Sequence, residues 1–106
     1  MAMKINQAIF EQEVEQGKKA CLVDFYADWC GPCQMLGPIM EELAQAGYPI
    51  YQVNVDEEKE LAMRFQVLSI PTLILFKDGE AVERLVGLQS KKTLQEKLDY
   101  YGLQAQ

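Results

Sequence analysis

The sequence contains no histidine and only three cysteines among its 106 residues. A small, odd number of cysteines does not fit a secreted scaffold that several disulfides hold together. It fits a reducing compartment, where paired thiols more often take part in chemistry than in holding structure. We therefore expect a cytoplasmic protein whose cysteines have a chemical role.

Positive charge is also scarce, since ten Lys and Arg residues stand against sixteen Asp and Glu, for a formal net charge of -6. The basic residues are scattered, and the only adjacent pairs are Lys18-Lys19 and Lys91-Lys92. Because phosphate binding depends on clustered Lys and Arg, we do not expect nucleic acid as a main partner. The acidity is interpreted as a surface charge that keeps the chain in solution.

Long hydrophobic runs are missing as well. No stretch approaches the roughly 18 apolar residues that span a bilayer, and residues 1–6 lack the apolar core of a secretory signal. No repeat, low-complexity tract or Ser/Pro/Gly-rich linker divides the chain, and its 49% hydrophobic share can fill one core. We expect a soluble single domain over residues 1–106, without a membrane anchor.

The apolar patterns predict alternating strands and helices. The expected strands cover about residues 3–5, 20–26, 50–55, 72–77 and 80–86. The expected helices cover about residues 7–16, from Cys30 to about 46, 57–65 and 91–101. Strands separated by helices imply parallel pairing, and Asp78-Gly79 predicts a hairpin that adds an antiparallel pair. The expected fold is α/β, with a central mixed sheet of four to five strands flanked by four helices on both faces.

Helix boundaries are predicted from capping residues and glycines. The residues expected to cap helix N-termini are Asn6, Asp56 and Ser90. The residues expected on the apolar side of the first helix are Ala8, Ile9 and Val14. Gly17 and Gly47 should end the first two helices, and Pro38 should kink the second.

The segment Cys30-Gly31-Pro32-Cys33 lies between a nearly continuous apolar stretch and a helix. Two intervening residues bring both sulfur atoms within reach of a disulfide. At a helix start, free N–H groups and the positive end of the dipole stabilise a thiolate, which is the nucleophilic form. Cys30 can therefore attack a substrate disulfide, whereas Cys33, one turn further, should be more buried and should resolve the mixed disulfide.

Two other interpretations of the cysteine pair are weighed. A zinc site needs about four ligands, whereas this chain offers one Cys pair, a distant Cys21 and no His. An inert structural pair is the second alternative, but a pair at a strand–helix junction is the typical context of dithiol–disulfide redox chemistry. Cys21 lies within the apolar strand and is interpreted as a buried structural thiol.

Asp24 is the one charge in the apolar stretch of residues 20–26. Burial makes a carboxylate expensive to ionise, so its pKa should rise. A carboxyl of raised pKa can exchange protons with Cys33 near neutral pH. The alternative is a capping or solvated acid at the end of a strand.

The segment Trp29-Cys30-Gly31-Pro32-Cys33 resembles the active-site motif of thioredoxins. The resemblance covers about residues 7–101 and includes Val23–Ala27, Pro38, Asn54–Asp56, Ile70–Thr72, Phe76–Gly79 and Val86-Gly87. It implies the thioredoxin fold and the reduction of disulfides in target proteins through a reversible Cys30–Cys33 disulfide, with no bound cofactor. Electrons would come from NADPH through a thioredoxin reductase. We expect a monomer whose partners are that reductase and disulfide-containing targets.

The resemblance also implies roles for single residues. It marks Cys30 as the attacking thiol, Cys33 as the resolving thiol and Asp24 as the buried acid near the resolving thiol. The residues it places on the substrate-contact surface are Trp29, Gly31, Pro32, Ile70, Pro71 and Gly87. It makes Pro71 a cis-proline, although an Ile-Pro bond by itself favours trans.

Three residues depart from the family pattern. Tyr26 stands where many thioredoxins carry a second Trp, and Gln34 and Gln52 stand where Lys is common. Without these two cations the site is more acidic, so the family pattern does not fix the pKa values of Asp24 and the thiols.

Two other classes of function remain as alternatives. Related disulfide oxidases and isomerases usually carry a polar or basic residue, often His, between the cysteines, and Gly31-Pro32 supplies none. A binding module without redox turnover is the other class, and the intact cysteine pair and Trp29 argue against it as the only role.

Overall fold

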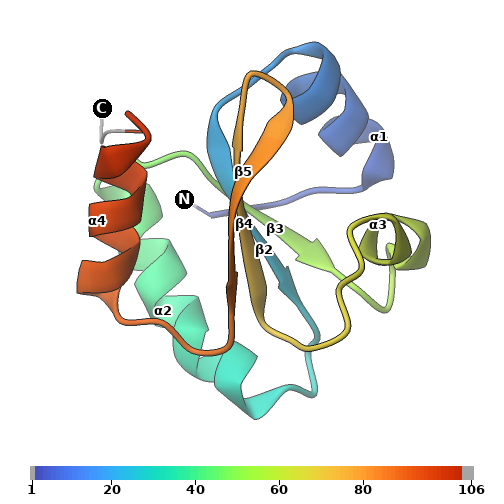
Figure 1. The fold of residues 1–106 in the computed structure, drawn as a ribbon. Coiled ribbons are helices and arrows are strands. Elements are labelled where there is room, and N and C mark those ends of the chain that lie inside the picture. The colour runs from blue at the N-terminus through green and yellow to red at the C-terminus, as the bar shows by residue number, and fades with distance from the viewer. Residues whose placement is uncertain (1, 104–106) are drawn as a thin grey trace.

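A five-stranded mixed sheet forms the centre of the molecule, with the strand order β1-β3-β2-β4-β5 (Figure 1). The computed structural model describes residues 2–103. The strands are β1 (Met3–Lys4), β2 (Cys21–Tyr26), β3 (Ile50–Asn54), β4 (Thr72–Lys77) and β5 (Glu80–Val86). β3 pairs in parallel with β1 and β2, whereas β4 runs antiparallel to β2 and β5. The predicted α/β fold with a mixed sheet is confirmed.

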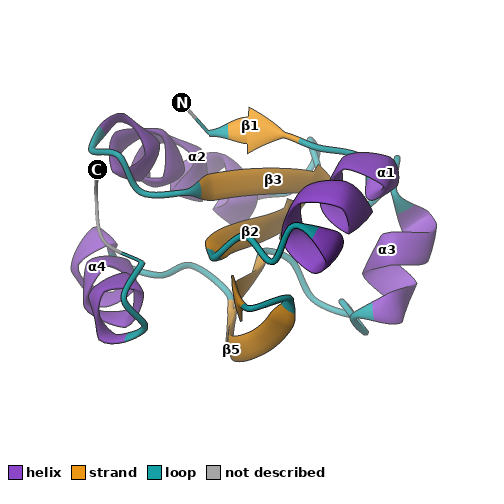
Figure 2. Cartoon of the chain, turned by 90° about the horizontal axis from the view of Figure 1, so that it is seen from above, coloured by secondary structure: helices purple, strands orange, loops and turns teal. Residues whose placement is uncertain are grey.

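Helices cover both faces of this sheet. They are α1 (Gln7–Ile9), which continues directly into the π-helix η1 (Phe10–Gln16), then α2 (Gly31–Gln45), α3 (Lys59–Arg64) and α4 (Lys91–Tyr100). Figure 2 shows α2 and α4 on one side of the sheet and α1 and α3 on the other. If α1 and η1 are taken as one continuous helix, the prediction of four helices on both faces is confirmed.

Two apolar layers separate the sheet from its helices, and β2 contributes to both. Cys21, Val23 and Phe25 pack in the layer under α1, η1 and α3, whereas Leu22 packs in the layer under α2 and α4. A strand covered on both faces needs apolar side chains at successive positions, which explains the nearly continuous apolar stretch in the sequence. Full burial of each large side chain contributes about 1.5–3 kcal/mol to folding.

The first helix turns two of its three predicted apolar residues, Ile9 and Val14, towards the core. Phe10 and Val14 are completely buried and Ile9 is half-buried, but Ala8 is exposed. The prediction for Ala8 is wrong because positions 10 and 14, four residues apart, define the buried side. The widened π-type turn is visible where the N–H of Gly17 donates to the carbonyl of Gln12 at 2.9 Å.

The predicted N-caps are confirmed at two helices and wrong at the third. Asn6 Oδ1 accepts from the N–H of Ile9, and Ser90 Oγ accepts from the N–H of Thr93. Asp56 does not cap α3, which begins later, at Lys59. Asn54 Oδ1 accepts from the N–H groups of residues 56 and 57, and this turn at the end of β3 delays the helix.

The hairpin between β4 and β5 turns at Asp78-Gly79, as predicted. Their φ angles are +55° and +84°, the left-handed conformation that a two-residue hairpin turn of this kind requires. Gly79 also approaches η1, because a Cβ there would lie 3.0 Å from the carbonyl oxygen of Glu15. Pro38 lies inside α2, which continues on both sides of it.

One edge of the sheet collects the ends of four strands. Tyr26 at the end of β2 pairs with Asn54 at the end of β3, and Thr72 at the start of β4 pairs with Val86 at the end of β5. The loops that leave or enter these positions therefore meet at a single edge. This edge carries the start of α2 and its cysteine pair.

Candidate active site

Cys30 and Cys33 form a disulfide at the start of α2, with their Cα atoms 5.2 Å apart. Cys30 is the N-cap of the helix, and its Sγ accepts a hydrogen bond from the N–H of Cys33 at 3.2 Å. Pro32 lies in the first turn, where an N–H would have no partner within the helix and its absence has no penalty. Free N–H groups at the start of α2 therefore face the Cys30 sulfur.

The two cysteines are buried to the same extent, with 5% of Cys30 and 6% of Cys33 exposed. The prediction that Cys33 is the more buried residue is wrong. The cluster of the two cysteines and Ala27 is covered by Tyr26, Val55 and Ile70, the last from the loop that precedes β4. The Ile70 carbonyl oxygen lies 3.7 Å from Cys30 Sγ.

The loop before β4 and the loop after β5 are joined beside the disulfide. The Ile70–Pro71 peptide bond is cis, which confirms the expectation drawn from the resemblance. The Pro71 carbonyl accepts from the N–H of Gly87 at 2.8 Å, and Gly87 has a φ of +90° that disfavours any larger residue. Pro71 is buried, whereas Ile70 and Gly87 are half-buried.

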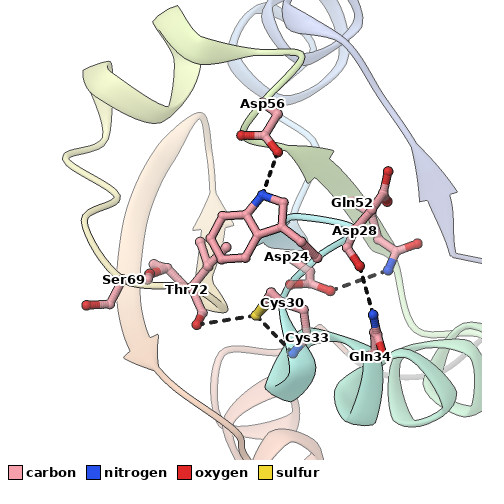
Figure 3. The surroundings of a disulfide bond; sticks show 11 residues. Asp24, Asp28, Cys30, Cys33, Gln34, Gln52, Asp56, Ser69 and Thr72 are labelled. Atoms are coloured by element: carbon pink, nitrogen blue, oxygen red, sulfur yellow. Dashed lines mark hydrogen bonds between the residues drawn. A yellow bond between two sulfur atoms is a disulfide. The ribbon is translucent and has the colours of Figure 1, made fainter.

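Trp29 is 70% exposed next to the cysteines and is held by a residue that the sequence did not single out for this role. Its Nε1–H donates to Asp56 Oδ2 at 2.8 Å, and Figure 3 shows Asp56 at the top of the site. The carboxylate that was predicted to cap a helix is instead the partner of the indole. The pairing of β2 with β3 could have predicted this contact, because residues 29 and 56 follow the paired ends of these two strands.

Asp24 lies near the two cysteines (Figure 3) and is buried, with only 1% of its surface exposed. It lies opposite Gln52 in the β2–β3 register, and Gln52 Nε2 donates to its Oδ2 at 3.3 Å. Within the described residues 2–103, the buried Oδ1 has no hydrogen-bond partner. Burial raises the pKa of Asp24 from 3.8 to about 6, and the hydrogen bond from Gln52 opposes this rise. The predicted direction of the shift is confirmed.

A cavity of about 190 Å³ lies beside Cys33 and Gln52. The residues that line it are Tyr26, Ala27, Asp28, Cys33, Gln34, Gly37 and Gln52. It is large enough for several water molecules, each of which occupies about 30 Å³ in the liquid. Gln34 is uncharged, and its Nε2 donates to the backbone carbonyl of Asp28 at 2.8 Å (Figure 3).

Among the described residues that line this cavity there is no lysine or arginine, so no cation there offsets the cost of ionising the buried carboxyl. Across residues 2–103, no three His, Cys, Asp or Glu side chains are grouped in a way that could hold a metal ion. In the same part of the chain, no helix is both long enough and apolar enough to cross a bilayer.

Cys21 lies on the opposite face of β2 from Asp24 and is completely buried. Burial raises the pKa of its thiol to about 12, so it stays protonated and unreactive at neutral pH. The interpretation of Cys21 as a structural thiol is thus supported by its position.

Cys21→Val is expected to keep full disulfide-reducing activity and to change the free energy of unfolding by less than about 1.5 kcal/mol, because the change nearly conserves volume. Urea unfolding together with a turnover assay of the same sample measures both quantities. A folded Cys21→Val protein without turnover would reveal a third redox thiol.

The disulfide at the start of a helix, with a cis-proline loop beside it and a buried carboxyl near it, defines a thiol–disulfide oxidoreductase of α/β fold. The family model described as Thioredoxin matches residues 1–100. The thioredoxins of Staphylococcus haemolyticus and Staphylococcus aureus are each 47% identical to this chain over 100 residues, which cover 92% of this chain and 94% of theirs. The solved structure of a mutant thioredoxin from Halobacterium salinarum NRC-1 is 38% identical, with a TM-score of 0.85, and the match covers 98% of this chain and 95% of that one.

The chain belongs to the thioredoxin family. It is a protein-disulfide oxidoreductase that works by dithiol–disulfide exchange through the Cys30–Cys33 pair, and a reductase returns the pair to the dithiol form. This chemistry needs no bound cofactor, because the two sulfur atoms themselves carry the electrons. Its substrates are disulfide-containing proteins.

Proposed function

We propose that Cys30 is the attacking thiol and Cys33 the resolving thiol. The observation that carries this assignment is the capping position of Cys30, whose Sγ accepts the N–H of Cys33 at 3.2 Å. In the reduced protein the same N–H group faces the sulfur, and the positive end of α2 favours its negative charge. Cys33 has its sulfur one turn inside the helix, so Cys30 is the better placed of the two to form the thiolate that attacks.

In the proposed reaction, the Cys30 thiolate attacks one sulfur of the target disulfide. The target S–S bond breaks, a Cys30–target disulfide forms, and the leaving target thiolate takes up a proton. Cys33 then loses its proton and attacks Cys30 Sγ, which releases the second target thiolate. Two electrons have moved to the target, and the protein is left with the Cys30–Cys33 disulfide that the structure contains.

We propose that Asp24 accepts the proton that Cys33 loses. Cys33 and Gln52 line the same cavity, and Gln52 is hydrogen-bonded to the Asp24 carboxylate. Water in this cavity provides the route between the thiol and the acid. With a pKa of about 6, Asp24 is ionised at neutral pH and is a stronger base than an ordinary carboxylate.

The proposed substrate-contact surface surrounds the disulfide. It consists of Trp29, Gly31, Pro32, Ile70, Pro71 and Gly87. Three observations support it: Trp29, Gly31 and Pro32 are exposed, Ile70 lies against Cys30, and a hydrogen bond joins Pro71 to Gly87. A target segment can therefore reach the Cys30 sulfur between these loops.

The wider setting is proposed from the family and the composition. We propose that the chain is a single-domain monomer over residues 1–106, located in the cytoplasm, without nucleic acid or membrane as a partner. Its electron donor is NADPH, acting through a thioredoxin reductase. The net charge of -6 and the dispersed basic residues support the absence of a nucleic-acid partner.

Iodoacetamide labelling of the reduced protein tests the thiol assignment. Cys30 should be alkylated first, because the thiolate is the reactive form, and Cys21 last, because it is buried and protonated. Mass spectrometry of peptides after short exposures gives the order, and the Cys30→Ser protein controls for labelling at the other sites. Preferential labelling of Cys33 would reverse the assignment.

A further inference from the structure

The side chain of Gln34 reaches back across the cysteine pair. Gln34 lies near the start of α2, directly after Cys33, and its Nε2 donates to the Asp28 backbone carbonyl at 2.8 Å (Figure 3). Asp28 precedes Cys30 in the turn between β2 and α2. The hydrogen bond therefore closes a loop over residues 28–34 that contains both cysteines, and we call it the Gln34–Asp28 tether.

The disulfide closes part of the same loop, because it joins Cys30 to Cys33. When two links close one loop, each of them removes conformational freedom that the other would otherwise have to overcome. The tether is therefore stronger when the disulfide is present than when it is reduced. Coupling of this kind is reciprocal, so the tether in turn stabilises the disulfide.

The tether fixes the turn that carries Cys30 to the helix that carries Cys33. Cys33 is part of α2, whereas Cys30 is the N-cap and its position depends on the residues before it. The hydrogen bond from Trp29 to Asp56 holds this turn to the segment after β3, not to α2. Once the S–S bond is broken, the tether still holds the turn against the helix.

We propose that Gln34 is a positioning residue that keeps Cys30 within reach of Cys33 while Cys30 is joined to a target. The inference rests on the proposed roles of the two cysteines and adds a residue that sets the rate of the second step. In that step Cys33 attacks Cys30 Sγ within one chain, so the rate depends on the effective concentration of one sulfur at the other. The tether raises this concentration without adding a charge, because the glutamine side chain is neutral. It therefore speeds release of the target and favours the disulfide over the dithiol.

Gln34→Met tests the proposal, because Met has a similar length and helix propensity but no N–H donor. Gln45→Met is the matched control, since Gln45 is also exposed on α2 but lies at its last residue. The pre-reduced proteins are mixed with the small disulfide dithiobis-nitrobenzoate in a stopped-flow instrument, and absorbance records the thionitrobenzoate released. The first release is the second-order attack by Cys30, and the second is the first-order attack by Cys33 on the mixed disulfide.

Gln34→Met should slow the second release about threefold and leave the first unchanged, because the net effect of one hydrogen bond on an equilibrium is about two- to tenfold. Gln45→Met should match the wild type in both releases. An unchanged second release in Gln34→Met, or the same slowing in Gln45→Met, would overturn the proposal. So would equal slowing of both releases, because Gln34 would then act on the reactivity of Cys30 and not on closure of the loop.

The reduction potential gives an equilibrium readout of the same coupling. The wild type and both variants are equilibrated in buffers of oxidised and reduced dithiothreitol, and alkylation followed by mass spectrometry measures the dithiol fraction. A loss of about threefold in disulfide stability raises the potential of Gln34→Met by about 14 mV, because tenfold corresponds to about 30 mV for two electrons. A potential equal to that of the wild type would contradict stabilisation of the disulfide by the tether.

Failure of the proposed cysteine roles gives a different result. If Cys33 were the attacking thiol, Cys30→Ser would keep the first release at the wild-type rate, whatever the effect of Gln34→Met. If only the role of Gln34 is wrong, Cys30→Ser loses the fast first release while Gln34→Met behaves like the wild type.

Discussion

Cys33→Ser is expected to turn the protein into a trap that stays covalently attached to its targets. Attack by Cys30 survives, because its capping position and the N–H donated to its sulfur are backbone features of α2. Resolution is lost, because serine cannot displace the mixed disulfide. Incubation with disulfide-containing proteins, followed by non-reducing electrophoresis and peptide mass spectrometry, should show targets joined to Cys30.

Cys30→Ser is the matched control for the trap. It keeps Cys33 and the fold, but it should form no mixed disulfide, and its rate of disulfide reduction should fall to that of the buffer. Mixed disulfides through Cys33 in this variant, or sustained turnover by Cys33→Ser, would contradict the assigned roles.

Asp24→Asn is expected to stabilise the oxidised protein by about 3 kcal/mol at neutral pH, which corresponds to a rise in pKa from 3.8 to about 6. The folded pKa is raised, so the unfolded carboxyl ionises first as the pH increases. Asp24 therefore lowers stability above pH 3.8, and the penalty grows until the pH reaches about 6. The Asn side chain can still accept the hydrogen bond from Gln52.

Urea unfolding of the oxidised proteins at several pH values measures this difference. The stabilisation by Asp24→Asn should be complete above about pH 6 and absent below 3.8, where Asp24 is protonated in both states. The same variant should release mixed disulfides more slowly, because Cys33 loses its proton acceptor. A stabilisation that does not change with pH would show that the carboxyl does not titrate with a raised pKa.

Gln52→Lys is the companion variant for the buried carboxyl. A cation beside Asp24 favours its ionised form, so the pKa of Asp24 should fall from about 6 towards its ordinary value. Carboxyl-carbon NMR titration of Asp24 in the wild type and in Gln52→Lys measures both values. A pKa without response to the lysine would place the new cation away from the carboxyl, and a wild-type pKa near 3.8 would remove the proposed proton acceptor.

Local patterns were sufficient to predict the sheet, its hairpin and the thiol site. The apolar stretch that became β2 is buried on both faces, and the Asp78-Gly79 turn has the conformation that its sequence requires. Asp24 was expected to be buried because it was the single charge in that stretch. These predictions succeeded because burial and turn geometry act on residues close together in the chain.

Contacts between distant segments were not predictable in the same way. Asp56 was expected to cap a helix, but the turn that Asn54 stabilises moves the start of the helix further along the chain. The Asp56 carboxylate instead accepts a hydrogen bond from the indole of Trp29. The residues that pack on Cys30 and Cys33 include Val55 and Ile70, which are far from both along the chain. The cis bond at Pro71 followed only from the family resemblance, because an Ile-Pro bond alone favours trans.

The reduction of insulin disulfides by dithiothreitol, followed as precipitation of the released insulin chain, tests the central claim most directly. Catalytic amounts of the wild-type protein should shorten the lag and speed precipitation well beyond dithiothreitol alone, and Cys30→Ser should match dithiothreitol alone. A folded wild-type protein that gives no acceleration would contradict disulfide reduction through Cys30 and Cys33.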